Sequence, residues 1–435
     1  MKRMKYWGLG LLLVGFFSFN SAGLWNTLIL ENSPNVKLFL TFGLAVIGGL
    51  MYVIPDLKLE GLPGIKNDGI FQNPATNKGW IAWLIFGYLI GFYILLYFYP
   101  EYLEPQIRLV DPISKSLNGG LASNWFLYGL MYCLFMSVMG IKMLIKYRHN
   151  RYQVFRTLSV IFFQLGFAFL IPELLVRFQL PWYDFKNAWP LNYYFFFDWN
   201  IQQLISAGQI GMFMLGWGIA LSLIIVPIMV YFYGKRWYCS WVCGCGGLAE
   251  TAGDPYRQHS DKSLKAWRFE RYIVHAVLGF AILMTVAVLW GEATFLGIET
   301  YQIQKWYGFA IGSIFSGVIG TGFYPIFGNR VWCRFGCPLA AYMGIIQRFK
   351  SRFRITTNGA QCISCGNCST YCEQGIDVRS YAQKGQNIVR SSCVGCGICA
   401  AVCPRGVLKL ENGPEDNRIN EQPLVVTQNG VELNP

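Results

Sequence analysis

Long apolar stretches recur along most of this chain and are separated by short polar segments. An α-helix rises about 1.5 Å per residue, so about 20 apolar residues cross a bilayer core of about 30 Å. Stretches of this kind lie near Trp7–Leu24, Val36–Ile54, Gly79–Tyr99, Asn124–Ile145, Phe155–Val176, Gly208–Tyr231, Tyr272–Trp290 and Trp306–Phe327. The pattern therefore predicts an all-α polytopic membrane protein with about eight transmembrane helices.

The composition supports this class of protein. Hydrophobic residues make up 54% of the 435 residues and charged residues only 14%, whereas an ordinary soluble domain has about 25% charged residues. These proportions exclude a soluble globular protein and a disordered chain. The formal net charge is +13, but no basic stretch falls in a nucleic-acid motif, so we expect no nucleic-acid partner.

The basic residues gather in loops that set the orientation of the helices. Residues 142–156 and 330–354 contain several Lys and Arg and no acidic residue. Because such loops stay on the cytoplasmic side, eight crossings place both termini there. The first span follows a basic start without a clean small-residue cleavage site, which favours a retained helix over a signal peptide. We expect a multi-pass protein of the bacterial cytoplasmic (inner) membrane.

The composition changes after about residue 355, where the chain becomes polar and rich in cysteine. We therefore expect a transmembrane region of about five helices over 1–200 and a transmembrane core over 201–355. A small cytoplasmic cysteine-rich domain is expected over 356–411, followed by a flexible tail over 412–435.

The cysteine-rich domain contains two runs of the form Cys-x2-Cys-x2-Cys-x3-Cys, which is the spacing of bacterial ferredoxins. In such runs the first three cysteines hold one [4Fe–4S] cube and the fourth holds the other cube. The first cluster is expected at Cys362, Cys365, Cys368 and Cys403, and the second at Cys393, Cys396, Cys399 and Cys372. Zinc sites show separated CxxC pairs instead. The runs predict an α+β ferredoxin domain with two [4Fe–4S] clusters, in which Glu373 stands where a proline often follows the fourth cysteine.

An internal repeat carries a second group of cysteines. The segment 233–243 matches 327–337 in register, and each copy follows an apolar span and contains a Cys-x3-Cys motif. The motif cysteines are Cys239, Cys243, Cys333 and Cys337. They could hold a third iron–sulfur cluster or another metal, or act as redox dithiols. A purely structural role is less favoured because the pairs match in register. Cys245 is an extra thiol that could replace a ligand or stay free.

Other polar and aromatic residues have weaker signals. His275 lies in a predicted span without a facing histidine, which favours a structural hydrogen bond or a quinone contact over haem. Glu173 is a weak candidate for a quinol proton acceptor. The aromatic residues of 181–200 are typical of an interfacial belt on the outer side of the membrane. Cys133, inside a span, is expected to pack in the core.

The chain resembles membrane polyferredoxins of the NapH/NosR type over roughly residues 200–411. The resemblance is carried by the paired motifs, including Cys333-x3-Cys337-Pro338, and by the tandem ferredoxin runs. It implies electron transfer between membrane quinol and a redox partner, as in proteins that serve nitrate and nitrous-oxide reductases. The chain is also distantly similar to the RdxA/FixG/CcoG accessory proteins of cytochrome oxidase assembly.

We therefore hypothesise a membrane electron carrier that passes electrons between the quinone pool and a respiratory or redox partner protein. It would act as an electron-transfer subunit of an oxidoreductase, similar to a quinol dehydrogenase, and no catalytic side chain is assigned. Two alternatives stay open: an accessory factor that reduces or assembles a metal centre of a respiratory enzyme, and a redox-sensing regulator.

Overall fold

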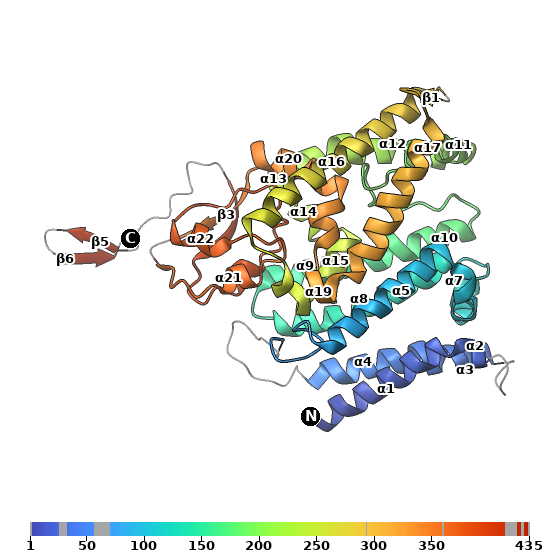
Figure 1. The fold of residues 1–435 in the computed structure, drawn as a ribbon, viewed down its shortest axis with the longest axis horizontal. Coiled ribbons are helices and arrows are strands. Elements are labelled where there is room, and N and C mark those ends of the chain that lie inside the picture. The colour runs from blue at the N-terminus through green and yellow to red at the C-terminus, as the bar shows by residue number, and fades with distance from the viewer. Residues whose placement is uncertain are drawn as a thin grey trace.

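The computed structural model describes residues 2–25, 33–55, 70–292, 294–358, 361–413, 424–427 and 430–433. Helices dominate these residues, and the strands among them form three two-stranded antiparallel pairs. Figure 1 shows a body of long helices, with the cysteine-rich domain at one end of it.

Among the described residues, six helices are long and apolar enough to cross a membrane. They are α3–η1–α4 (Pro34–Val53), α5 (Trp80–Phe98), α8 (Asn124–Lys146), α9–η4–α10 (Arg151–Arg177), α12–η5–α13 (Gly208–Tyr233) and α16 (Leu264–Leu289). The remaining two expected spans fall in α1 (Lys2–Asn20) and in α17 (Thr300–Tyr307) with η7 (Gly308–Ile319). The helical, membrane-type architecture is thus as expected, while the count of eight stays a prediction.

Short helices connect the long ones. They are α2 (Ala22–Trp25), η3 (Pro100–Leu103), α6 (Glu104–Arg108), α7 (Asp111–Leu117), α11 (Asp198–Ser206), α14 (Arg236–Cys239), α15 (Gly244–Thr251), η6 (Asp254–His259), α18 (Gly320–Gly322), α19 (Tyr324–Phe327), η8 (Trp332–Gly336) and α20 (Pro338–Phe349). A small hairpin of β1 (Thr294–Phe295) and β2 (Ile298–Glu299) precedes α17.

The N-terminal helix α1 packs closely along α4 (Leu44–Val53) at one edge of the helical body (Figure 1). A Cβ atom at Gly8 would lie 2.7 Å from the carbonyl oxygen of Gly48, and one at Gly48 would lie 2.6 Å from that of Gly8. Glycine at both positions therefore permits a backbone contact that a larger residue would block.

The segment 181–200 folds back into the helical body instead of forming only an outer belt. Tyr183, Phe195 and Phe197 are buried. The hydroxyl of Tyr238, the residue before Cys239, donates a hydrogen bond of 2.7 Å to the carbonyl of Lys186. Tyr183 and Phe195 pack in one hydrophobic cluster and Phe197 packs in another, so these three rings are core residues and not a lipid-facing belt. Trp182 and Trp199 of the same segment are exposed, as the belt interpretation expects.

The cysteine-rich domain is built on the antiparallel pair β3 (Phe353–Thr357) and β4 (Leu408–Asn412), in which Phe353 is opposite Asn412. Three short helices, α21 (Asn367–Thr370), α22 (Val378–Gln383) and α23 (Ile398–Ala401), lie between these strands in the chain. Gly366 and Gly397 precede α21 and α23 with φ of +79° and +75°, a backbone region that favours glycine. The expected tail lies largely outside the described residues, and its described parts pair as β5 (Leu424–Thr427) with β6 (Gly430–Leu433).

Candidate iron–sulfur sites

The first predicted ligand set surrounds one pocket of the cysteine-rich domain. Cys362, Cys365, Cys368 and Cys403 all line it. The first three come from the loop before α21 and from α21 itself, while Cys403 follows α23. The fold therefore brings the last cysteine of the second run next to the first three of the first run.

The second set surrounds another pocket in the same crosswise manner. Cys393, Cys396, Cys399 and Cys372 line it together with Glu373. Burial raises the pKa of the Cys393 thiol to about 11 and that of Cys396 to about 12. Buried thiols of this kind are poor free nucleophiles, and a bound metal centre stabilises their thiolate form. The donor set thus fits a four-iron cluster, which supplies one-electron transfer when bound.

The two Cys-x3-Cys motifs meet in a single hydrophobic core. Cys239, Cys243 and Cys337 are buried there, with Cys333 and Cys245 partly buried against them. The two copies of the repeat also have the same local structure, because the second cysteine of each motif directly precedes a helix. Cys243 precedes α15 and Cys337 precedes α20. Burial raises the pKa of Cys239 to about 12, so a thiolate at Cys239 needs a cationic centre beside it.

Cys245 belongs to this group and is not isolated from it. Its side chain hydrogen-bonds that of Cys243, and this bond lowers the pKa of Cys243 to about 6 despite burial. The same hydrogen bond, together with burial, raises the pKa of Cys245 well above its usual range. The motif cysteines and this extra thiol therefore lie in one group.

None of these groups has the compact form of a single-ion site. Within the described residues, no three His, Cys, Asp or Glu side chains are close enough together to hold one metal ion. A single Zn²⁺ holds its sulfur ligands at about 2.3 Å, whereas a four-iron cube places one iron between each sulfur ligand and the centre of the site.

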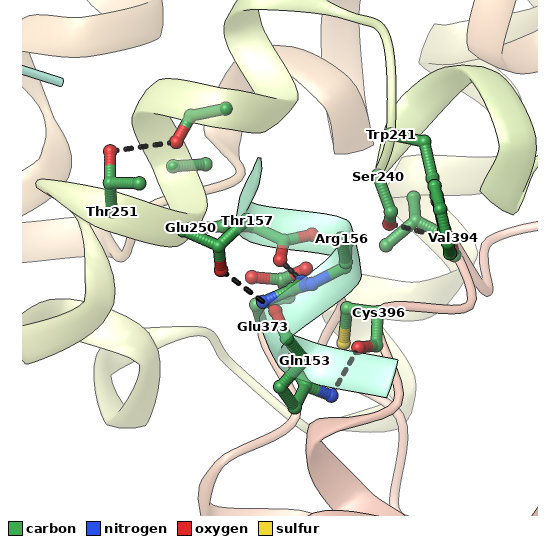
Figure 2. Close-up of polar contacts among 12 residues, drawn as sticks. Gln153, Arg156, Thr157, Ser240, Trp241, Glu250, Thr251, Glu373, Val394 and Cys396 are labelled. Carbon is green, nitrogen blue, oxygen red and sulfur yellow. Dashed lines mark hydrogen bonds and ion pairs between the residues drawn. The ribbon is translucent and has the colours of Figure 1, made fainter. Parts of the chain in front are cut away.

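A chain of buried charges joins the cysteine-rich domain to the helical body. Glu373 accepts hydrogen bonds or ion pairs from Arg257 at 2.7 Å and from Arg330 at 2.8 Å. Arg330 also pairs with Glu250. Glu250 pairs in turn with Arg156 (Figure 2). Burial opposes ionisation of Glu373, but the attraction of both arginines lowers its pKa to about 2.

This network extends to Asp254 and Lys146, which lie 2.7 Å apart. Its members carry four positive and three negative charges, on Lys146, Arg156, Arg257, Arg330, Glu250, Asp254 and Glu373. Arg330 also approaches the sulfur of Cys333, at 3.7 Å from Nη1. The excess of buried positive charge beside the cysteines complements the negative charge of a thiolate-bound cluster.

Neutral hydrogen bonds connect the first Cys-x3-Cys loop directly to the second ferredoxin run. Ser240 Oγ donates to the carbonyl oxygen of Val394 at 2.8 Å (Figure 2). Trp241 Nε1 donates to the hydroxyl of Tyr152 at 3.1 Å, and that hydroxyl donates to the Gly395 carbonyl at 2.8 Å. Two loops that are far apart in sequence are therefore held in contact.

More hydrogen bonds hold the same ferredoxin run from helices α9 and α20. Gln153 Nε2 donates to the carbonyl of Cys396 at 2.9 Å, and Gln347 Nε2 donates to that of Cys393 at 2.8 Å. In the helical body, Gln164 donates to the Val242 carbonyl, and Tyr132 donates to that of Gly244 at 2.8 Å. Sequence reasoning missed these residues, and their only signal was a polar side chain inside or beside an apolar span.

The remaining sequence candidates lie apart from the cysteine groups or have simple partners. His275 Nδ1 is 2.6 Å from the carbonyl oxygen of Arg271, one turn earlier in α16. Glu173 accepts a hydrogen bond of 2.7 Å from Asn118. Cys133 is buried and its sulfur lies 3.8 Å from the Gln164 carbonyl, which agrees with its expected place in the core.

Protein-family models match both cysteine-containing regions. A "4Fe-4S dicluster domain" matches residues 361–408. A "4Fe-4S binding domain" matches residues 215–263 and 307–356, and each of these segments contains one Cys-x3-Cys motif. Both models are described as 4Fe–4S domains, and together they cover the repeat and the ferredoxin part.

Three curated proteins with similar sequences are ferredoxin-type or electron-transport proteins by name. The "Putative electron transport protein YccM" of Escherichia coli is 27% identical over 178 residues, 38% of this chain and 48% of that protein. The "Methylamine utilization ferredoxin-type protein MauN" of Methylobacillus flagellatus is 28% identical over 156 residues, 35% of this chain and 53% of MauN. MauN of Paracoccus denitrificans is 27% identical over 190 residues, 40% of this chain and 63% of that protein.

The chain thus spans about half the length of the first two of these relatives. No solved structure matches it. The matched 4Fe–4S domains, the names of these relatives and the apolar helices fit a membrane polyferredoxin.

Proposed function

We propose that this protein is a membrane electron carrier that takes electrons from quinol and delivers them to a redox partner protein. Three iron–sulfur sites would carry the electrons. The ferredoxin sets Cys362, Cys365, Cys368 and Cys403, and Cys393, Cys396, Cys399 and Cys372, would each hold a [4Fe–4S] cluster. Cys239, Cys243, Cys333 and Cys337 would hold a third cluster, with Cys245 as an additional sulfur.

The contact between Ser240 and Val394 is the observation that carries this proposal. Ser240 follows Cys239 in the chain and Val394 follows Cys393, and a hydrogen bond of 2.8 Å joins them. The proposed third site and the second ferredoxin site are therefore connected through one neighbouring residue on each side and one hydrogen bond between them. Electron transfer between two clusters requires proximity of this kind.

The protein's own residues hold this connection dry and rigid. Ser240 is fully buried and Val394 is 2% exposed. Gln347 and Gln153 fix the backbone on either side of Val394 through the carbonyls of Cys393 and Cys396. Because this link is buried and its geometry is fixed, it moves little when a neighbouring cluster gains or loses an electron. The structural reorganisation that accompanies electron transfer is therefore small.

We further propose that the ferredoxin part faces the cytoplasm and docks an acidic partner. Four exposed basic residues lie on it, namely Arg379, Lys384, Arg405 and Lys409. Its two acidic residues between 362 and 410 are Asp377, which is partly buried, and Glu373, which is fully buried. A positive face of this kind favours fast association with a negative partner surface, at a rate that falls with rising salt.

Iron and sulfide analysis of anaerobically purified protein, together with EPR, tests the cluster assignment. Three cubes correspond to about twelve irons per chain and two cubes to about eight. Addition of a reduced quinone to protein in lipid discs should then bleach the visible absorption of the clusters. About eight irons would contradict a cluster at the third site. Full iron content without bleaching would contradict quinol as the electron donor. Colourless protein that contains only zinc would overturn the whole proposal.

A further inference from the structure

A third pocket, besides the two lined by the ferredoxin cysteines, lies next to the cysteine repeat. It is lined by Trp267 and Arg271 of α16, by Cys333, and by Gln374 and Ser392 of the cysteine-rich domain, among others. The pocket therefore lies between the start of a membrane-type helix, the second Cys-x3-Cys motif with the helix α20 that follows it, and the ferredoxin loops, with Lys235 of the first repeat copy beside them. It is separate from the two pockets that the ferredoxin cysteines line.

The pocket is lined by buried hydrogen-bond donors without acceptors. Arg334 is 4% exposed and Gln374 is 3% exposed. Within the described part of the chain, Arg334 Nη2 and Gln374 Nε2 have no hydrogen-bond partner. Lys235, which is 3% exposed, makes only a long hydrogen bond of 3.5 Å to the Ala340 carbonyl there. Because buried donors without acceptors are costly, this grouping indicates a ligand that supplies oxygen acceptors.

The charges of the lining residues decide which kind of acceptor fits. Lys235, Arg271 and Arg334 are positive, and Glu270 is the one carboxylate among the described lining residues. Glu270 is already bound to Arg334 at 2.6 Å. Two positive charges are left without a carboxylate in the lining, so an anion with several oxygens fits better than a neutral carbonyl compound.

The position of the pocket suggests where such an anion comes from. The lining residues of α16 lie in its first three turns, and the neighbouring side chains of Phe269 and Tyr272 are 60% and 69% exposed. Aromatic and basic residues at the end of a span are typical of the membrane–water interface, where lipid head groups lie. Basic pockets between membrane helices on the cytoplasmic side bind such head groups.

We infer that this pocket binds a phosphate group, supplied by the head group of an anionic phospholipid or by free phosphate. Arg334, Gln374 and Lys235 donate to its oxygens from inside the protein, and Arg271 pairs with it at the mouth. The bound anion would join the ferredoxin part to the membrane helices at the level of Cys333. This inference does not depend on the electron donor.

The test uses the full-length, cluster-loaded protein in discs of phosphatidylcholine, with phosphatidylglycerol or inorganic phosphate added separately. Thermal unfolding is followed as a function of the added anion. We expect an anion-dependent rise in the unfolding temperature for the native chain, with the apparent affinity weakened about tenfold in Arg271→Gln and in Gln374→Leu, as for loss of one charge-assisted hydrogen bond. If only phosphatidylglycerol raises the unfolding temperature, the ligand is a lipid head group. If inorganic phosphate raises it as well, the pocket recognises the phosphate group itself.

Arg268→Gln is the matched control, because Arg268 is exposed on the same helix and does not line the pocket. It removes the same charge as Arg271→Gln and should leave the affinity unchanged. Iron content and cluster absorption show that each variant is folded and loaded. Equal weakening by Arg268→Gln and Arg271→Gln, absence of any stabilisation, or stabilisation by a short-chain quinone in place of the anions would overturn the inference.

Discussion

The carboxylate of Glu373 lies 2.8 Å from the guanidinium of Arg330, deep between the cysteine-rich domain and the helical body. Glu373 directly follows Cys372, and Arg330 stands three residues before Cys333. One ion pair therefore joins a ferredoxin run to the second Cys-x3-Cys motif. The position where many ferredoxins have proline is used here for docking.

Substitution of Glu373 by Gln should weaken this docking strongly. Arg330 and Arg257 are fully buried and would each lose a carboxylate partner. Loss of one member of a buried ion-pair network typically costs about 3–5 kcal/mol. Thermal unfolding of the loaded protein should show the loss, while Glu299→Gln, at an exposed position of the β1–β2 hairpin, should leave the unfolding temperature unchanged. Equal stability of the two variants would contradict a docking role.

Substitution of Ser240 by Ala should remove the direct link to Val394. The Val394 carbonyl would lose its hydrogen bond from Ser240, at a cost of about 1 kcal/mol in stability. Electron transfer from the proposed third site to the ferredoxin clusters should become slower. Rapid-freeze EPR after mixing with a reductant measures this rate, with Ser206→Ala in α11 as the control. An unchanged rate in Ser240→Ala would show that electrons take another route.

Substitution of Cys333 by Ser should reduce the iron content from about twelve to about eight per chain and leave the ferredoxin EPR signals in place. Cys133→Ser is the control, because Cys133 is buried in the core formed with α5 and α8 and lines neither ferredoxin pocket. The control should retain all of its iron. If Cys333→Ser also retained it, the repeat would not hold a cluster.

The buried pairs of Asp254 should make the stability depend on pH at the acidic end. Burial opposes ionisation of Asp254, but Lys146 and Arg257 outweigh it and lower the pKa to about 2. The pKa in an unfolded chain is about 3.9, so this stabilisation is complete above about pH 4 and is lost as the pH falls toward 2. Two pKa units correspond to about 2–3 kcal/mol.

Unfolding of the native chain and of Asp254→Asn, compared at about pH 5 and about pH 3, measures this contribution. The difference in stability between the two proteins should shrink as the pH falls. Asp198→Asn, at an exposed position, should show no such trend. A constant difference across this range would mean that the pairs do not contribute in the way described.

The sequence by itself determined the elements whose signals are local. A membrane-type helix needs only a run of apolar residues, because lipid surrounds it wherever it lies in the chain. The ferredoxin runs were equally readable, since three cysteines at three-residue spacing approach one cube without help from distant segments. The repeat was visible as well, but its use was not, because two short motifs do not show whether they meet.

Only the tertiary structure decided what lies between these elements. The contacts of Glu373 with Arg330, and of Ser240 with Val394, join residues 43 and 154 positions apart. The segment 181–200 was interpreted as an interfacial belt, because a sequence rich in aromatic residues is compatible both with a belt and with a protein core. The partners in buried ion pairs and hydrogen bonds are distant in sequence and close in space, so no local sequence pattern predicts these contacts.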